Sequence, residues 1–511
     1  MTTSHTPVKA LAILGTGSDV GKSLIVAGIC RLLLRRNVRI APFKAQNMAL
    51  NSFVTLDGGE IGRAQALQAQ ACGIEPTVEM NPILLKPESD SRSQVIVKGS
   101  VYEALDALEY FERKETLFTI VRECYARLAS EYECVVIEGA GSAAEVNLRD
   151  RDMVNWPVVE MADASVILVA DIDRGGVFAQ IIGTLDLLAP QERERVCGVI
   201  VNKFRGDRRL FEDGVHMLEA RTGLPVLGVV PFVRDLQLDQ EDSLDLERSR
   251  SVQFEPDLIN VAVVLLPRMS NFTDFNALAA ETDVALRFCV LPEDLRGADV
   301  VIIPGSKNTL EDLDYLVTSG FPGALESHVN KAGEVLGICG GYQMLGLQVS
   351  DPKGLERGGT SRGLGFLDVT TELDAPKICR QVHATSLLLG IERHAPVRGY
   401  EIHMGRTNRR TGNPCFHIEK SEIGEGNARG DDGAANENGR VWGTSIHGLF
   451  DQAGFRRAWL NRARNRKGLP PISLRESELV TTHLGAELDR WADHLHQHVR
   501  MEFVYSALKV M

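Results

Sequence analysis

The chain has 511 residues and a net charge of -13 at pH 7, with 44% hydrophobic and 24% charged residues. This length exceeds what one hydrophobic core supports, so two domains are expected. The acidic balance disfavours general binding to nucleic acid, whose phosphates it would repel. The nine cysteines form no Cys-x-x-Cys pair, and no apolar run approaches the roughly 20 residues of a membrane span. We therefore expect no zinc ribbon, no disulfide framework and no membrane contact. We expect a cytoplasmic location.

The first predicted elements are a strand at residues 11–14, a glycine-rich loop and a helix from residue 24 to about 34. A loop in this position binds phosphate through its backbone N–H groups and the helix N-terminus. We expect Lys22 to reach the β- and γ-phosphates of ATP, and the Ser23 hydroxyl to ligate Mg²⁺. The Gly-Thr-x-x-x-Val-Gly-Lys frame resembles the dethiobiotin synthetase and ParA-like branch of P-loop proteins. The predicted nucleotide contacts in this loop are Gly15, Thr16, Gly17, Gly21, Lys22 and Ser23.

Polar side chains follow the second predicted strand, residues 38–43. Lys44, Gln46 and Asn47 come directly after it. Because open α/β sheets bind ligands at the carboxyl ends of their strands, these residues are candidate substrate or metal contacts. The alternative, that they are solvated loop residues, remains open. Residues 60–70 and 102–130 are predicted to be helical.

An acidic group follows the next buried strand, residues 134–138. Glu138 at its end would lie beside the phosphate loop, as a Mg²⁺ ligand or a group that orients water. Asp150 and Asp152 come shortly after it. Each is either a contact to metal or substrate or a residue of a solvated loop.

The remaining strands of the first half alternate with helical stretches, which predicts a parallel, doubly wound sheet. Asn202 ends one of them and is a candidate contact to the adenine base. These strands span residues 164–171, 196–202 and 225–232.

A second series of strands follows an acidic, polar stretch at residues 236–256, which is predicted to link two domains. The strand at residues 334–338 runs into Cys339, which has glycines close on both sides and a helix-compatible sequence after it. This is the pattern of a nucleophile elbow, in which a helix N-terminus favours the thiolate. A buried structural cysteine is the alternative, and the glycine frame argues against it.

A reactive thiol needs a general base, and histidine can deprotonate a thiol near neutral pH. Three histidines of the second half compete for this role: His383, His403 and His447. His447 is the best placed, because it ends a predicted strand and the glycines close to it leave room for a substrate.

Two motifs, Gly-Ile-Cys-Gly-Gly-Tyr-Gln (residues 337–343) and Ser-Ile-His-Gly-Leu-Phe (residues 445–450), resemble the class I, triad-type glutamine amidotransferases. The resemblance implies that Cys339 attacks the side-chain amide of glutamine and that ammonia leaves. It also implies an oxyanion hole formed by the backbone N–H groups of Gly305 and Gly340.

One position departs from the pattern of most triad members, which carry Glu two residues after the histidine. This chain has Leu449 there. The cobalamin-pathway amidotransferases share the departure. The acid that orients His447 is left open, and Asp451 is the nearest candidate.

The union of a dethiobiotin-synthetase-like half with a Cys-His glutaminase half is similar to the cobyrinic acid amidases. Residues 43–51, 60–70, 171–179, 202–207 and 399–405 resemble the cobyric acid synthase family in particular, and the resemblance covers about residues 9–455. It implies amidation of the b, d, e and g carboxylates of adenosylcobyrinic acid a,c-diamide through an acyl phosphate. The alternatives are the a,c-diamide synthase, another glutamine-fed ligase, or a ParA-like ATPase switch with an inert glutaminase half.

We therefore expect an α/β protein with two doubly wound domains. The first, residues 1–235, would be a P-loop domain that binds ATP, Mg²⁺ and the corrinoid. The second, residues 257–455, would be a flavodoxin-like class I glutaminase domain, and residues 456–511 a helical segment without identified chemistry. Expected ligands are ATP, glutamine and the corrinoid. A homo-oligomer remains an option.

Overall fold

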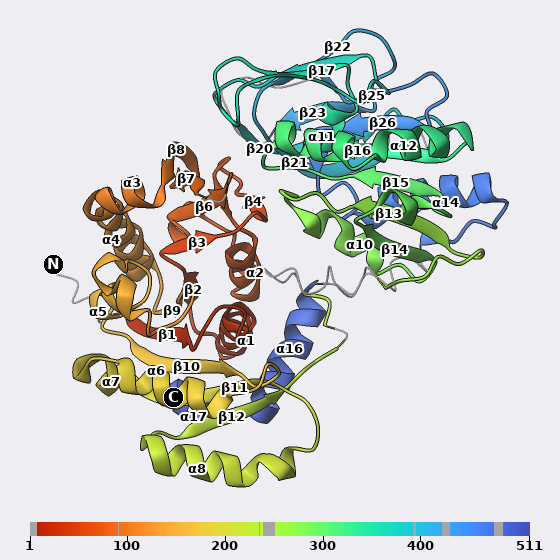
Figure 1. Ribbon diagram of the computed structural model, residues 1–511. Helices are drawn as coiled ribbons and strands as arrows, with labels where there is room; N and C mark the ends of the chain where they lie inside the picture. Colours follow the sequence, from red (N-terminus) through yellow and green to blue (C-terminus); the bar gives the residue numbers. More distant parts are fainter. Residues whose placement is uncertain are drawn as a thin grey trace.

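A computed structural model describes residues 8–89, 91–234, 236–238, 251–391, 395–421, 430–474 and 484–510. These residues form two α/β domains that lie side by side (Figure 1). The fold class expected from the sequence is confirmed. Residues 239–250, which make up most of the predicted linker, lie outside the described part of the chain.

The first domain is built on a parallel sheet of six strands. Alternate residues of its central strand face opposite sides: Leu11 and Ile13 belong to one core, and Ala12 and Leu14 to the other. Burial on both faces explains the nearly continuous apolar sequence. In spatial order the strands are β12 (Val226–Pro231), β11 (Val196–Phe204), β10 (Ser165–Asp171), β1 (Lys9–Gly15), β9 (Cys134–Glu138) and β2 (Ile40–Phe43).

Helices cover both faces of this sheet. Helices α1 (Lys22–Arg35) and α2 (Arg63–Ala71) contribute to one core. The opposite core takes its side chains from α4 (Lys114–Glu131), α5 (Trp156–Met161), α6 (Val177–Leu187) and α8 (Glu212–Thr222). The short helices α3 (Ala107–Glu112) and α7 (Pro190–Arg195) also belong to this domain.

Two small sheets are inserted after β2, and they correct two helix predictions. The hairpin β4 (Ser52–Val54) and β5 (Glu60–Gly62) occupies residues predicted to start a helix, so α2 begins only at Arg63. Residues 102–106, also predicted to be helical, belong to a strand instead. It is β8 (Ser100–Asp106), the edge of a sheet with β3 (Gln46–Met48), β6 (Ile83–Pro87) and β7 (Arg92–Val97). Cross-strand pairing outweighed the helix-forming residues in both segments.

The second domain has its own six-stranded sheet, parallel except for the edge strand β25. Helices α11 (Thr309–Thr318) and α12 (Phe321–Asn330) contribute to its core. The strand order is β14 (Val284–Cys289), β13 (Ile259–Val264), β15 (Val300–Ile303), β16 (Glu334–Ile338), β26 (Val441–Thr444) and β25 (Ala434–Ala435).

Two further sheets extend this domain. An antiparallel sheet contains β24 (Gly430–Asp432), β23 (Phe416–Ser421), β20 (Ile378–Ser386), β21 (Pro396–His403) and β27 (Ile446–His447). A mixed sheet contains β18 (Gly359–Arg362), β17 (Gln348–Asp351), β19 (Val369–Glu372) and β22 (Arg406–Arg409).

The C-terminal segment divides between the two domains. Helix α14 (Ala453–Lys467) packs in the core of the second domain. Helices α16 (Leu484–His498) and α17 (Met501–Ala507) instead lie on the first domain beside α1 and β12 (Figure 1). The Trp491 indole donates to the Leu24 carbonyl at 2.6 Å, and Asp489 pairs with Arg31 at 2.7 Å. Among the described residues, no helix is long and apolar enough to cross a membrane.

The domains meet where the β4–β5 hairpin reaches the second domain. Val54 packs with Tyr400 and Ile402 in a small apolar cluster. The Gln381 amide donates to the Val54 carbonyl at 2.5 Å. Lys307 pairs with Glu88 across the same boundary at 2.7 Å, with both side chains buried. This contact brings first-domain side chains close to Cys339.

Candidate active sites

Cys339 lies on the sharp turn that its sequence predicts. Strand β16 ends at Ile338, and helix α13 (Gly340–Met344) begins directly after the cysteine. The cysteine has a φ of 52°, which is rare for a residue with a side chain. A Cβ on Gly341 would lie only 1.9 Å from the Ile303 carbonyl oxygen. The glycines next to the cysteine are therefore steric requirements of the turn.

His447 and an aspartate complete a buried constellation with this thiol. The Nδ1 atom of His447 lies 2.7 Å from Oδ2 of Asp274, and both side chains are buried. The other carboxylate oxygen, Oδ1, accepts the Gly448 N–H at 3.0 Å. Tyr400 stacks on the histidine ring, with centroids 5.3 Å apart. The imidazole is thus fixed in plane, with Nε2 left for the thiol.

The electrostatics of the pair favour a thiolate and an imidazolium. Burial lowers the pKa of His447, but Asp274 and the nearby sulfur outweigh it and raise this pKa to about 10. Burial raises the pKa of Cys339, but His447 and the Gly340 N–H outweigh it, so the thiol pKa lies below its ordinary value. A lower thiol pKa increases the fraction of the thiolate, which is the nucleophilic form.

Asp274 was not found from the sequence, and Asp451 is not the residue that binds Nδ1 of the histidine. Asp274 precedes His447 by 173 residues. It lies in the short 3-10 turn η4 (Phe272–Phe275), which follows strand β13. Its only sequence signal is an acid shortly after a buried strand, a pattern that occurs many times in this chain. Asp451 is exposed, and its backbone N–H donates to Gly448.

A second histidine also lies near the sulfur. His403, at the end of β21, lines the same cavity as Cys339. Burial lowers the pKa of His403, but Glu401 and Cys339 outweigh it and raise this pKa above the usual value. Glu401 also accepts from Arg380 at 2.5 Å. His403 in turn contributes to lowering the pKa of Cys339.

The predicted oxyanion donors flank the catalytic groups. A Cβ on Gly305 would lie 3.0 Å from Cε1 of His447, so this loop touches the imidazole. A Cβ on Gly340 would lie 2.9 Å from the Ser306 nitrogen, so the two predicted loops are in contact. Their assignment as an oxyanion hole stays a prediction.

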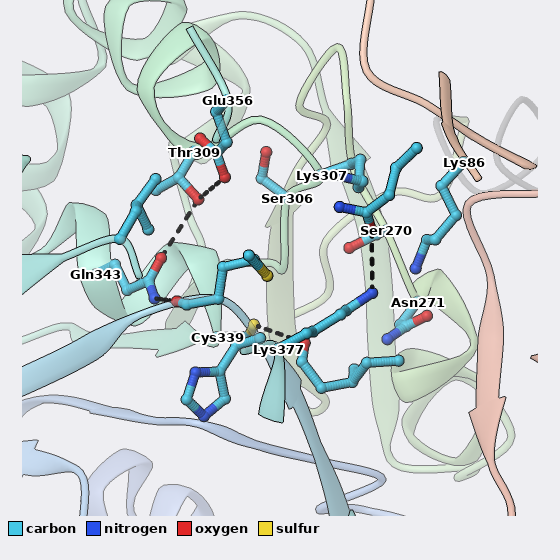
Figure 2. A pocket seen from close by; sticks show the side chains of 15 residues that line it. Lys86, Ser270, Asn271, Ser306, Lys307, Thr309, Cys339, Gln343, Glu356 and Lys377 are labelled. Atoms are coloured by element: carbon cyan, nitrogen blue, oxygen red, sulfur yellow. Dashed lines mark hydrogen bonds between the residues drawn. The ribbon is translucent and has the colours of Figure 1, made fainter. Parts of the chain in front are cut away.

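The cavity at Cys339 has walls from both domains. Figure 2 shows Lys86, of the first domain, on the same side of the cavity as Lys307 and Lys377 of the second domain. Lys86 donates to Glu60 at 2.7 Å, and Lys377 donates to the same carboxylate at 2.5 Å. Burial lowers the pKa of Lys86 to about 8, although Glu60 opposes the shift. Opposite them, burial raises the pKa of Glu356 to about 7.

In the first domain, the glycine-rich loop lies between β1 and α1 as expected. Gly21 has a φ of 93°, and a Cβ there would lie 2.3 Å from the side-chain nitrogen of Asn202. Only glycine fits this position. The Lys22 ammonium donates to the carbonyls of Gly17 at 2.8 Å and Gly141 at 3.0 Å, which holds it over the loop.

The start of the loop is fixed to the sheet, and its end is fixed to β11. The Thr16 N–H donates to Val169 at 2.9 Å, and Gly15 accepts from the Ala143 N–H at 2.8 Å. The Asn202 amide donates to the Val20 carbonyl at 2.9 Å. Asn202 therefore supports the loop directly. A contact to a nucleotide base stays a prediction.

Glu138 gathers the candidate metal and substrate residues around one buried carboxylate. It accepts from Ser23 at 2.8 Å and from Lys44 at 2.9 Å. Gln68 and Gln65 donate to the other oxygen, at 2.5 Å and 3.3 Å. Burial raises the pKa of Glu138, but Lys44 and these hydrogen bonds outweigh it and keep the pKa below its usual value. The carboxylate is therefore charged at neutral pH.

Asn47 and Gln46 point to different surroundings. The Asn47 amide donates to Gln65 at 3.0 Å and so joins the Glu138 network. Gln46 accepts from the Tyr110 hydroxyl at 2.5 Å, and both line a separate cavity of about 780 Å³. The buried position of Asn47 rules out the solvated-loop alternative for that residue.

The two aspartates after β9 differ in role. Asp152 accepts the N–H groups of Val154, Asn155 and Trp156 at 2.9–3.0 Å, so it fixes a turn. It also lines the 780 Å³ cavity. Asp150 is exposed, and its carbonyl accepts from Lys114.

The 780 Å³ cavity lies beside the phosphate loop. It shares Gly141 with the contacts of Lys22, and Ser18 of the loop lines it. Its walls are largely apolar, with Leu85, Tyr110, Phe111 and Trp156 among them. Three arginines also line it: Arg92, Arg149 and Arg151.

Comparisons with known proteins match both halves of the chain. Residues 11–244 match the CobQ/CobB/MinD/ParA nucleotide binding domain. Residues 260–455 match the CobB/CobQ-like glutamine amidotransferase domain.

Curated relatives match over almost the full length. Cobyric acid synthase of Syntrophobacter fumaroxidans is 48% identical over 499 residues, 96% of this chain and 97% of that protein. The cobyric acid synthases of Klebsiella pneumoniae strain 342 and Dehalococcoides mccartyi strain CBDB1 are 48% and 46% identical, over 98% of this chain in both cases. They cover 98% and 99% of those proteins. With its phosphate loop and its Cys-His-Asp constellation in one polypeptide, the chain belongs to the cobyric acid synthase family.

Proposed function

We propose that this protein is a glutamine-hydrolysing ligase of cobalamin biosynthesis. It would amidate the b, d, e and g carboxylates of adenosylcobyrinic acid a,c-diamide, with ATP as energy source. The observation that carries the proposal is one chain holding a phosphate loop beside a large cavity and a buried Cys-His-Asp constellation. An ATP switch with an inert second domain would not need a thiol whose pKa is lowered in this way.

The second domain supplies ammonia. The Cys339 thiolate attacks the side-chain amide carbon of glutamine, and the oxyanion is stabilised by backbone N–H groups, for which Gly305 and Gly340 are the candidates. His447 gives its proton to the departing nitrogen, so ammonia leaves and a γ-glutamyl thioester remains. Water, deprotonated by the same imidazole, then releases glutamate. Asp274 holds the ring in the required tautomer throughout.

The first domain activates the carboxylate. A carboxylate oxygen is a poor leaving group, so transfer of the γ-phosphoryl group of ATP gives an acyl phosphate, which ammonia attacks with loss of phosphate. The loop from Gly15 to Ser23 would hold the phosphates through its N–H groups, with Lys22 balancing their charge. Asn202 would support the loop and contact the base.

Mg²⁺ fits the oxygen donors of this site. The Ser23 hydroxyl and the Glu138 carboxylate lie 2.8 Å apart and offer the hard ligands that Mg²⁺ prefers. Within the described part of the chain, no three His, Cys, Asp or Glu residues converge as a complete metal cage. Mg²⁺ commonly takes one or two protein ligands and completes its shell with phosphates and water. When bound, it would neutralise charge on the phosphates.

The 780 Å³ cavity is our candidate site for the corrinoid. A corrin macrocycle presents a broad apolar face with carboxylates at its edge. The cavity offers apolar walls beside the phosphate loop, with Arg92, Arg149 and Arg151 to meet carboxylates. Gln46 and Asp152 line the wall of this cavity. Lys44 and Asn47 lie beside Glu138. These four residues are candidates for orienting the reacting carboxylate.

The decisive experiment supplies purified protein with the a,c-diamide, ATP, Mg²⁺ and glutamine, and follows the corrinoid by mass spectrometry. Four successive amide additions are expected. Absence of turnover on this substrate, with amidation of cobyrinic acid instead, would assign the chain to the a,c-diamide reaction. ATP hydrolysis without glutamate release would favour the switch.

A further inference from the structure

Two hydrogen bonds join the first domain to the turn that carries the triad acid. The Ser52 N–H donates to Oδ1 of Asn271 at 3.0 Å. In return, the Phe272 N–H donates to Oδ1 of Asn51 at 3.0 Å. Asn51, Ser52 and Asn271 are all buried. Each domain therefore satisfies a backbone donor of the other, through three residues that are themselves shielded from water.

On the second-domain side, these two hydrogen bonds are made by Asn271 and Phe272, which begin the turn that carries Asp274. Asn271 precedes η4 directly and has a left-handed backbone, with φ 54° and ψ 44°. The Asp274 N–H donates to the Asn271 carbonyl at 3.1 Å. A single 3-10 turn has few hydrogen bonds of its own. Its position therefore depends strongly on the groups that hold its start.

The hairpin side of the contact is anchored within the first domain. Ser52 Oγ donates to Glu60 at 2.8 Å, and Lys86 donates to that same hydroxyl at 2.8 Å. The Asn51 carbonyl accepts the Arg63 N–H at 3.2 Å, at the start of α2. Asn51 and Ser52 are thus held by contacts within the first domain that do not involve the turn.

We propose that Asn51 and Ser52 are positioning residues of the glutaminase reaction: the first domain completes the triad by holding the Asn271–Phe272 turn. This inference rests on the proposed glutamine hydrolysis and adds to it. A shift of the turn would break the 2.7 Å contact between Asp274 and His447. Hydrolysis of glutamine would then depend on correct docking of the two domains, which keeps ammonia from being made where it cannot be used.

The test uses the full-length enzyme with Asn51→Ala, which removes the acceptor of the partly buried Phe272 N–H. Glutamine-driven amidation should fall about 10- to 100-fold, because the cost of the unsatisfied Phe272 N–H is expressed as displacement of the Asp274 turn. Ammonium-driven amidation should stay within about twofold. Asn271→Gly is the second variant, because glycine accepts the left-handed backbone and removes the acceptor of Ser52, together with a side chain that lines the Cys339 cavity. It should likewise lose glutamine-driven amidation and retain the ammonium-driven reaction.

A third readout reports the triad without any turnover. Iodoacetamide modifies the Cys339 thiolate, so the pH dependence of the alkylation rate reports the ionisation of the Cys339 thiol. A displaced Asp274 supports the imidazolium less, and the curve should move to higher pH in both variants. His403, the other histidine beside the sulfur, is untouched by either substitution. Gln381→Ala is the matched control, since it removes another interdomain hydrogen bond, to Val54, without touching the Asp274 turn. It should leave the glutamine-driven and ammonium-driven amidation rates, and the pH dependence of alkylation, as they are in the unmodified enzyme.

The outcomes separate the inference from the proposed function. Unchanged glutamine turnover and an unchanged alkylation curve in both variants would overturn the inference. Equal loss of the glutamine- and ammonium-driven reactions would assign Asn51 a structural role and also overturn it. If the unmodified protein released no glutamate, the proposed function would fail, and the alkylation curve would still decide whether Asn51 positions the triad.

Discussion

Replacement of Asp274 by Asn tests whether this buried acid is the third member of the triad. The substitution keeps the size of the side chain but removes the charge that lies 2.7 Å from His447. A hydrogen bond to a charged group contributes about 1.5–3 kcal/mol. Because about 1.36 kcal/mol corresponds to a factor of ten in rate, glutamine hydrolysis should fall about 10- to 150-fold.

The pH dependence gives the sign of the effect. Asp274 raises the pKa of His447, and the imidazolium lowers the pKa of Cys339. Without the acid, the imidazolium is less favoured and the thiol pKa rises. The rising limb of glutamate release against pH should therefore move to higher pH in Asp274→Asn.

The assay is glutamate release at saturating ATP and corrinoid, run beside amidation driven by ammonium. Ammonium-driven amidation should be unaffected, because the first domain is unchanged. Asp451→Asn, the nearest acid in sequence, is the control and should behave as the unmodified enzyme. Full glutamine turnover in Asp274→Asn, or a large loss in Asp451→Asn, would refute the triad described here.

Three further predictions concern other parts of the molecule. Cys339→Ala should abolish glutamine-driven amidation and retain the ammonium-driven reaction; loss of both would reveal a structural role for the thiol. Lys22→Ala should weaken ATP binding about 10- to 100-fold in calorimetry, since it removes one charge-assisted contact to phosphate, and unchanged affinity would contradict the phosphate-loop assignment. Gly341→Ala should cost about 3 kcal/mol of stability by overpacking against Ile303. Its melting temperature should fall, whereas Gly183→Ala in α6, where a Cβ meets nothing within 4 Å, should not destabilise.

The local motifs were predictable because each is contiguous in the chain. The phosphate loop needs a strand, glycines and a helix in immediate succession, and the elbow at Cys339 needs small residues next to one reactive side chain. Steric demands of this kind leave a direct record in the sequence. The glycines at 21 and 341 show this, since a Cβ at either would collide with neighbouring atoms.

Short strands were the least predictable elements. Residues 60–62 and 100–106 carry helix-compatible sequence, and the structure pairs them as strands β5 and β8. Pairing with a neighbouring strand decided their conformation, and that neighbour is not visible in a local window. The tail shows the same limit: helices were expected there, but the docking of α16 against α1 follows only from the packed domain.

The sequence by itself determined the two functional motifs of this protein, a phosphate-loop motif at residues 15–23 and the Cys and His motifs typical of glutaminases, because each motif is short and contiguous. Only the tertiary structure decided how the sites are completed. Asp274 reaches His447 from 173 residues away, Lys86 reaches the cavity of Cys339 from the other domain, and Asn51 holds the turn of the triad acid. Such contacts depend on where whole elements pack, and no local pattern of residues records the distance between two packed domains.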